Sequence, residues 1–265
     1  MEYTENETVR YAVTTENNVL HIRRADSRTM FSFFKFYRAQ RSEPVRVYLP
    51  QGAYKSLEVK ATSGDIAVPA GYIFDTASLH GASGDIACRA EFGSLSAETA
   101  SGDIALKNVK CNAAELCAAS GDATLENVKL GKNSCIETAS GKVQITNLEA
   151  AELNVETASG KVSLENAECA ALHINTASGG VELTHTVSAN SMEIGTASGS
   201  IRLENCDAAS LSLDSMSGSV VATLMTGKAF RAKSRSGKID IPFDSGEGLC
   251  KIETRSGSIR IKIAK

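Results

Sequence analysis

Apolar and polar residues alternate along most of this chain, in short stretches that meet at a recurring Ser-Gly pair. Around Gly160, apolar side chains lie at Leu153 and Val155 before the glycine, and at Val162 and Leu164 after it. Alternation with a period of two is typical of a half-buried β-strand. Each copy therefore predicts two short strands joined by a corner. We expect glycine at that corner because a residue without Cβ takes a positive φ at low cost.

The Ser-Gly pair returns every 18 to 20 residues, at Gly64, Gly84, Gly102, Gly121, Gly141, Gly160, Gly179, Gly199, Gly218, Gly237 and Gly257. A period near 20 residues is the signature of a solenoid, in which stacked neighbours bury a continuous core. Parallel crossovers are nearly always right-handed. The sequence therefore predicts an all-β fold, a right-handed parallel β-solenoid (β-helix) of about eleven coils over residues 61–265. Residues 1–60 lack the repeat and are expected to form N-terminal strands and a cap.

Stacking the copies in chain order places equivalent residues in ladders. The position two after each glycine carries Ile66, Ile86, Ile104, Ala123, Val143, Val162, Val181, Ile201, Val220, Ile239 and Ile259. Branched side chains suit a buried parallel sheet. By the same parity, Thr157 is expected to point inward. A polar ladder six after the glycine carries Asn108, Asn127, Asn147, Asn166 and Asn205, with His185 in the gap. Because Asn tolerates left-handed backbone, we interpret this ladder as turn-stabilising.

The N-terminal stretch has two features of its own. Residues 11–22 alternate around Glu16-Asn17-Asn18 and predict two strands joined by a turn. An aromatic run follows, made of Phe31, Phe33, Phe34, Phe36 and Tyr37. It is interpreted as a cap over the open end of the core, because terminal repeats must differ from internal ones. The alternative is an exposed tip that contacts a partner or a membrane.

Charge is unevenly distributed along the array. Residues 61–226 hold 8 Lys and Arg against 20 Asp and Glu, whereas residues 227–265 hold 10 against 4. This pattern argues against a nucleic-acid groove, which needs a continuous basic stripe. The basic residues near the C-terminus are expected to keep an exposed sheet edge soluble. The alternative is that they contact an anionic polymer or a membrane surface. They are Lys228, Arg231, Lys233, Arg235, Lys238, Arg255, Arg260, Lys262 and Lys265.

One acidic stripe follows the glycine in the first four coils, at Asp65, Asp85, Asp103 and Asp122. Stacked carboxylates repel one another unless a cation lies between them, so the stripe is a weak candidate for a calcium site. The glycine-rich calcium repeat of other solenoids is absent, which favours a solvated polar face. We expect no resident metal or cofactor.

Catalytic chemistry is not evident in the sequence. The four histidines occupy unrelated positions of the repeat and pair with no Cys or Asp by spacing. There is no Trp, and a sugar cleft usually needs aromatic platforms, so a polysaccharide-active β-helix enzyme is the least favoured interpretation. The seven cysteines include no Cys-x-x-Cys pair, and we expect reduced thiols. We therefore expect a protein that is not an enzyme.

The repeat Thr-Ala-Ser-Gly-Asp/Lys-Ile/Val, preceded by an expected strand over residues 45–50, resembles a family of bacterial domains of unknown function that carries an adhesin label. The resemblance covers residues 40–265 and implies a β-solenoid that is often surface-exposed or membrane-anchored. It implies no catalytic residues.

Two functions follow as hypotheses. The first is a non-enzymatic adhesion or binding module at the cell surface, with a signal or anchor upstream of Met1. Its partner would be a protein or a surface polymer, with membrane contact only through that anchor or partner. The alternative is a regulatory scaffold in envelope-stress signalling, with a cytoplasmic location also left open.

Overall fold

The computed structural model of this 265-residue chain describes residues 10–17, 19–25, 45–243 and 246–264. The chain divides into two compact units, residues 1–51 and residues 52–265. The described residues form strands and connecting loops, with no helix among them. Consequently, no helix in the described ranges is long and apolar enough to span a membrane.

In the first unit, β1 (Arg10–Glu16) and β2 (Val19–Ala25) form an antiparallel hairpin. Asn17, at the turn, has a φ of 51°, a left-handed conformation that Asn tolerates. The predicted pair of strands around this turn is confirmed. The strand expected over residues 45–50 is wrong, because only Arg46 makes an isolated bridge. Pro44 and Pro50 bracket that stretch, and each lacks the amide that a ladder needs.

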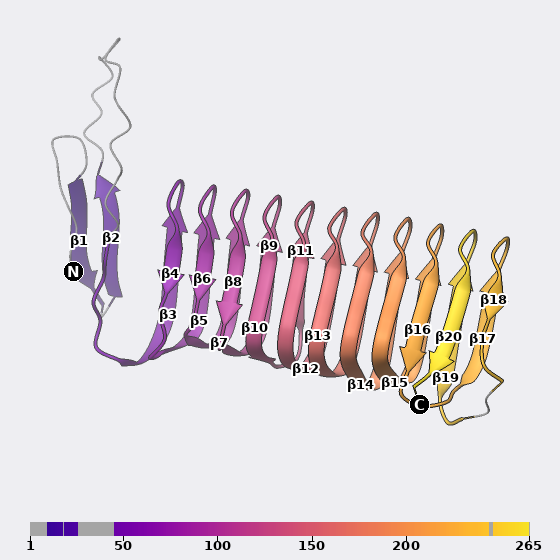
Figure 1. Cartoon of the computed structure of the whole chain (residues 1–265). Helices are drawn as coiled ribbons and strands as arrows, with labels where there is room; N and C mark the ends of the chain where they lie inside the picture. Colours follow the sequence, from indigo (N-terminus) through magenta and orange to yellow (C-terminus); the bar gives the residue numbers. More distant parts are fainter. Residues whose placement is uncertain (1–9, 18, 26–44, 244–245, 265) are drawn as a thin grey trace, which may run out of the picture. The chain divides into compact units, whose positions relative to one another are not determined.

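The second unit is a rod of stacked coils in which neighbouring strands pair in parallel (Figure 1). Its strands are β3 (Gly52–Ala61), β4 (Ile66–Val68), β5 (Tyr72–Gly81), β6 (Ile86–Cys88), β7 (Glu91–Thr99), β8 (Ile104–Lys107), β9 (Lys110–Ala118), β10 (Ala123–Leu130), β11 (Ser134–Thr138), β12 (Val143–Thr157), β13 (Val162–Thr176), β14 (Val181–Thr196), β15 (Ile201–Ser215), β16 (Val220–Leu224), β17 (Ala229–Ser234), β18 (Ile239–Asp240), β19 (Leu249–Thr254) and β20 (Ile259–Ile263). The fold is a parallel β-solenoid of about eleven turns, as predicted.

The solenoid begins earlier than the expected boundary at residue 61. β3 pairs with β5 from Gly52↔Tyr72 to Ala61↔Gly81, so residues 52–60 already belong to the first coil. Tyr54 stacks on Phe74 with ring centroids 5.7 Å apart, and Phe74 stacks on Phe92 at 6.1 Å. Aromatic rings therefore line the core at this end of the rod.

The long strands β12 to β15 each turn a corner at the Asn ladder. Asn147 and Asn166 have φ of 56° and 55°, and His185 in the gap has 49°. Neighbouring side chains are linked, with Asn147 Nδ2 donating to Asn127 Oδ1 at 2.8 Å. The predicted turn-stabilising role of this ladder is confirmed. Strand pairing resumes directly after each Asn, which is why the two short strands expected per coil appear here as one longer, bent strand.

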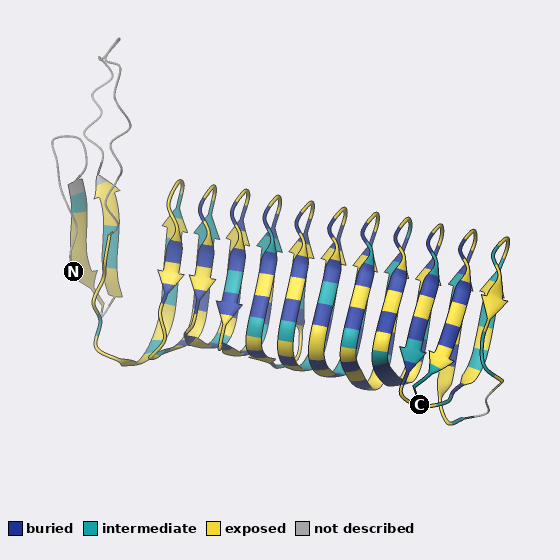
Figure 2. Ribbon diagram, in the orientation of Figure 1, coloured by how far each residue is buried: buried dark blue, intermediate teal, exposed yellow. Residues whose placement is uncertain are grey.

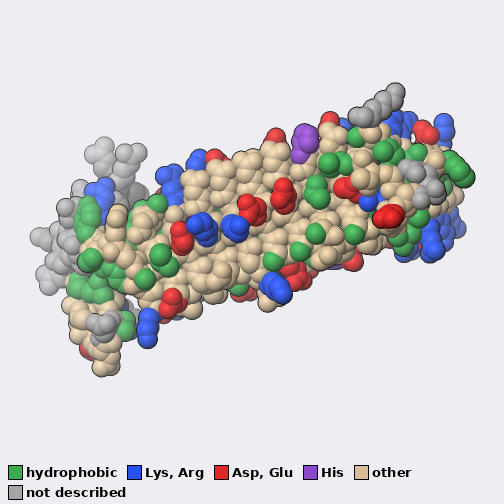
Figure 3. All heavy atoms as spheres, turned by 90° about the horizontal axis from the view of Figure 1, so that it is seen from below, with side chains coloured by type: hydrophobic (Ala, Val, Ile, Leu, Met, Phe, Trp, Pro, Cys, Tyr) green, Lys and Arg blue, Asp and Glu red, His purple; other side chains and the backbone are tan. Residues whose placement is uncertain are grey.

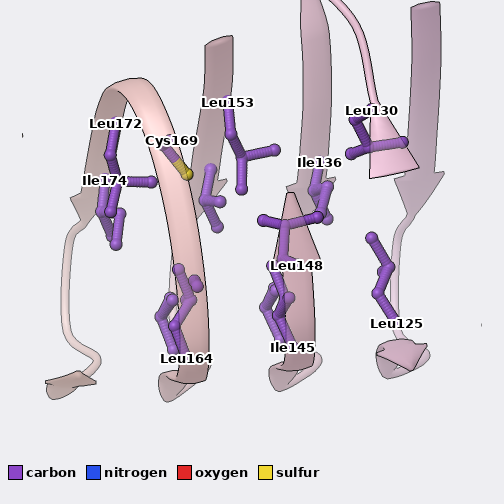
Figure 4. Packing of buried hydrophobic residues seen from close by; sticks show 14 of the residues in the cluster. Leu125, Leu130, Ile136, Ile145, Leu148, Leu153, Leu164, Cys169, Leu172 and Ile174 are labelled. Carbon is purple, nitrogen blue, oxygen red and sulfur yellow. The ribbon is translucent and has the colours of Figure 1, made fainter. Parts of the chain in front are cut away.

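The apolar ladders form one continuous core along the rod (Figures 2 and 4). In Figure 4, Ile145, Leu164 and Leu148 point inward from adjacent coils towards side chains such as Leu153. At the position two after the glycine, every residue of the ladder is buried except Ile239, which is 40% exposed. Burying one such side chain fully contributes about 1.5–3 kcal/mol to stability.

The coils at the C-terminal end are not stacked in chain order. β19 pairs with β15 on one side and with β17 on the other, and β20 lies in the same way between β16 and β18. Figure 1 shows the yellow coil of β19 and β20 inserted before the orange coil of β17 and β18. The expected ladder order Val220, Ile239, Ile259 is therefore wrong, and the order in space is Val220, Ile259, Ile239.

Two crossover segments make this insertion possible. The first segment follows β16 and passes the place beside β15 and β16 that β19 and β20 occupy. Lys228 is buried in this segment, with its Nζ 2.7 Å from Asp207 Oδ1. The chain later returns through Gly246, packed against Gly227, and through Gly248, whose φ is 92°. Lys228 thus does not belong to the exposed basic edge in which the sequence placed it. Its carboxylate partner compensates the cost of burying its charge.

Candidate binding surface

Each Thr-Ala-Ser-Gly loop begins with a buried hydroxyl group. Thr196 is 5% exposed; its Oγ1 accepts a hydrogen bond from Gly199 N at 2.9 Å and donates to Gly179 O at 3.1 Å. The hydroxyl thus joins the loop of its own coil to that of the neighbouring coil. Thr157, equally buried, accepts from Gly160 N at 2.9 Å, which confirms its predicted inward orientation.

The glycine of each loop is required by the distance between coils. A Cβ added to Gly160 would lie 1.6 Å from the carbonyl oxygen of Gly141. Among the described glycines, positive φ is found at Gly71 and Gly248, which are not Ser-Gly glycines. The expectation that these corners need positive φ is therefore wrong. The glycines allow neighbouring coils to stack closely, whereas the residues of the Asn ladder adopt the left-handed backbone conformation.

Each Asp of the stripe directly follows a loop glycine, and its carboxylate accepts a hydrogen bond from a backbone amide. Asp65 Oδ1 accepts a hydrogen bond from Asp85 N at 3.0 Å, and Asp85 Oδ1 accepts from Asp103 N at 2.9 Å. The series continues to Asp122, which accepts from Lys142 N at 2.7 Å. Each carboxylate thus satisfies an amide of the next coil, which offsets the repulsion along the stripe. Among the described residues there is no group of three or more side chains suited to hold a metal ion.

A long groove runs beside the loops, along the strand segments that precede them. Its volume is about 1090 Å³, and it reaches from the loop after β5 to the loop after β15. The small residue of each loop lies along it, at Ala82, Ala100, Ala119, Ala139, Ala158, Ala177 and Ala197, with Met216 in the last of these coils. At about 4.8 Å per coil, these eight positions span about 34 Å. The groove is therefore long enough for an extended ligand.

The strand face beside the groove carries charge of one sign. We define the acidic face as the outward residues one and three positions before the first residue of each loop, from β5 to β15. That first residue is Thr in five of these coils and Gly81, Ala118 or Ser215 in the others. Six of these residues are carboxylates, namely Glu98, Glu115, Glu137, Glu156, Glu193 and Asp214, and no Lys or Arg is among the described residues there. The cations of these coils lie elsewhere, for example Lys161, which pairs with Glu182 at 2.6 Å. The acidic face therefore suits a cationic ligand.

Two histidines belong to the acidic face, and sequence analysis missed their partners. His80 Nδ1 lies 3.2 Å from Glu98 Oε2, and His80 Nε2 lies 2.8 Å from Ser78 Oγ. His173 repeats the pattern, with Glu193 Oε2 at 3.5 Å and Asn175 at 2.9 Å. The available signal was the spacing, because each Glu follows its His by about one coil.

The group Ser78, His80 and Glu98 has the connectivity of a catalytic triad, but its surroundings differ from those of a hydrolase. β5 is paired on both sides, with β3 and with β7. The amides around Ser78 are thus engaged in the ladder, whereas acyl transfer needs free donors aimed at the oxyanion. The group therefore presents polar contacts on an open sheet face.

Two partly exposed thiols, Cys117 and Cys135, also belong to the acidic face. Burial and the neighbouring Glu137 raise the pKa of Cys135 to about 12. Burial, followed by the charges of Glu137 and Glu115, raises the pKa of Cys117 as well. Both thiols are consequently protonated and weakly nucleophilic near neutral pH. All seven cysteines are free thiols.

The aromatic run of Phe31, Phe33, Phe34, Phe36 and Tyr37 lies outside the described residues.

A family model described as Toastrack DUF4097, a domain of unknown function, matches residues 1–186 and again residues 152–265. No curated protein and no solved structure matches the chain. The two overlapping matches together run through both compact units of the chain.

Proposed function

Because the chain belongs to the Toastrack family, whose function is unknown, we propose a function from its own surface: a non-enzymatic binding module that holds a cationic partner along the groove. The observation that carries this proposal is the combination of a groove with alanines along its length and an acidic face without Lys or Arg among its described residues. Long-range attraction would concentrate a positively charged segment at this face.

The partner class is an extended cationic segment of a protein or a cationic surface polymer. Rim carboxylates such as Glu137 and Glu156 are exposed and belong to adjacent coils, so successive charges along the ligand would meet successive coils. Alanines between them leave room for a main chain or for the stems of long side chains. An adhesin role is one form of this proposal, in which the partner belongs to another cell or to a surface.

A binding assay with a defined ligand tests the groove. A fluorescent peptide of alternating Lys and Gly is titrated with the full chain, and anisotropy is recorded at low and at physiological salt. We expect binding that salt weakens, and a loss of about tenfold or more in the variant Glu137→Lys with Glu156→Lys.

The matched control is Glu165→Lys with Glu204→Lys, which makes the same change in net charge. Both residues are exposed and lie on the strand segments that follow the loops, away from the groove. If both double variants lose affinity equally, the peptide responds to net charge alone and the groove is rejected. If the unaltered chain does not bind the peptide, the cationic partner class is rejected.

The surface location that an adhesin requires is a separate part of the proposal. Protease treatment of intact producing cells should clip the array while a cytosolic control protein survives. Protection of the array until the cells are lysed would rule out the adhesin role.

A further inference from the structure

The coil of β17 and β18 closes the rod and leaves part of its core open. Because β19 and β20 take the place beside β15 and β16, β17 and β18 have a paired neighbour on one side only within the described part of the chain. Phe243, directly after this coil, is 108% exposed, and Ile239 is 40% exposed. Figure 2 shows this coil largely in yellow and teal, whereas the coils before it carry bands of dark blue.

The same coil also carries exposed cations. Arg231, Lys233, Arg235 and Lys238 are all exposed. Asp240 is the carboxylate that the structure describes within β17 and β18, and its Oδ2 lies 3.8 Å from Arg260 Nε of the inserted coil. Lys233 is paired in register with Glu253 of that coil. Figure 3 shows Lys and Arg side chains gathered with hydrophobic ones at this end of the rod. We call the surface formed by Arg231, Lys233, Arg235, Lys238, Ile239 and Phe243 the basic tip.

We propose that the basic tip docks the rod end-on onto an anionic lipid surface. Lysine and arginine are drawn to anionic headgroups, and an exposed Phe beside them inserts at the boundary between headgroups and acyl chains. The proposal is independent of the groove. It also departs from the expectation that the chain meets a membrane only through an anchor or a partner.

The β18 side of this end offers little to an added protein strand. β18 contains two residues, and Pro242, which follows shortly after it, has no amide to donate. The exposed edge on that side therefore offers few backbone groups to a partner strand. A fully exposed Phe243, which follows a coil with four exposed cations, matches a headgroup layer that supplies both negative charge and an apolar interior.

The rest of the rod reinforces the end-on geometry. The acidic face, with Glu98, Glu137 and Glu156 exposed, would be repelled by the same lipid surface that attracts the tip. A cationic ligand could thus occupy the groove while the tip remains on the membrane.

Co-sedimentation of the full chain with vesicles tests the proposal. We expect binding to vesicles of equal parts phosphatidylglycerol and phosphatidylcholine, and none to phosphatidylcholine alone. Replacing all four tip cations by Gln should weaken partitioning several hundredfold, from about fivefold for each cation, which corresponds to about 1 kcal/mol. The matched control replaces Lys107, Lys129, Lys142 and Lys161 by Gln, which removes the same charge from other parts of the rod.

A fluorescence experiment separates insertion from surface attraction. The chain contains no Trp, so Phe243→Trp introduces a single reporter, and Val221→Trp provides an exposed control on the side of the rod. Emission from the indole of the Phe243→Trp variant should shift to shorter wavelength with the mixed vesicles, while emission from the control variant should not.

Three outcomes would overturn the proposal. The first is equal loss of binding in the tip and control charge variants, and the second is a blue shift at the control position. The third is competition by soluble polyphosphate together with unchanged binding of Phe243→Ser, which would indicate a soluble anionic polymer as the ligand. Circular dichroism of every variant confirms that the solenoid is intact, so that a loss of binding reports on the tip.

Discussion

At the scale of single residues, the repeat meets two backbone requirements with two different side chains. Left-handed corners fall to Asn, as at Asn147 with a φ of 56°, whose amide group also bonds to the neighbouring coil. Close approach falls to Gly, because at Gly160 a Cβ would overlap the carbonyl oxygen of Gly141. The steric requirement explains why each of these loops keeps its Gly.

The glycine requirement gives a prediction at this scale. Gly160→Ala should lower the free energy of unfolding by about 3 kcal/mol or more, because backbone atoms of two coils must separate. Gly180→Ala is the matched control, since its Cβ would lie 3.4 Å from Ser200 O, an ordinary contact. We expect the control to change stability by no more than about 1 kcal/mol. Urea unfolding measures both, and equal stability of the two variants would contradict the steric explanation.

At the scale of elements, the insertion of β19 and β20 is the feature that the repeat did not predict. Every coil presents the same ladders to both neighbours, so any coil can stack on any other. Periodicity therefore fixes the shape of a coil but leaves the order of coils open. The order is set by the crossover segments, where Lys228 is buried against Asp207 and Gly248 adopts a positive φ.

Cross-linking tests this order of coils. Ser212 is paired with Lys251, so the variant Ser212→Cys with Lys251→Cys should form a disulfide rapidly under mild oxidation. Stacking in chain order would instead place Ser212 beside Arg231. In the observed order these two residues are separated by β19, about 10 Å apart, and Ser212→Cys with Arg231→Cys should remain reduced. Peptide mass mapping distinguishes the engineered disulfide from any disulfide that involves a native cysteine. A disulfide between residues 212 and 231, with residues 212 and 251 reduced, would refute the insertion.

At the scale of the whole molecule, the long narrow core buries thiols along its length. Burial raises the pKa of Cys88, Cys169 and Cys250 to about 12, above the ordinary thiol value of 9.0. For Cys88 the nearby Cys111 adds to this effect, whereas for Cys250 the charge of Lys228 opposes it. The folded chain therefore holds these protons at a pH where the unfolded chain has released them.

Stability should consequently fall as pH rises from about 9 towards 12, and the contribution of these thiols should be fully present below pH 9. Three thiols give a slope of about 4 kcal/mol per pH unit within that window. Urea unfolding at a series of pH values measures the slope. A variant with Cys88, Cys169 and Cys250 replaced by Ala should have a flatter slope, because the two proteins differ only in these three thiols. Identical slopes would show that the buried thiols do not control alkaline stability.

The repeat pattern predicted the features that recur in each coil and missed those that depend on how the coils stack. Alternation around Gly160 predicted the strands and the inward Thr157, and Asn at a fixed position predicted the corners. The groove was missed because its alanines and carboxylates lie in different coils and become neighbours only after stacking. The exposure of Ile239 was missed for a related reason, since it depends on which coil closes the rod.

The inserted coil has a consequence for how this molecule is made. A solenoid stacked in chain order could be completed as it leaves the ribosome, each coil adding to the last. Here residues 229–240 emerge first, yet they reach their final neighbours only when residues 249–263 arrive to separate them from β15 and β16. The end of the rod therefore stays unfinished until that later segment has been synthesised, and a nascent chain halted before it would carry an unsealed sheet edge open to chaperones and proteases.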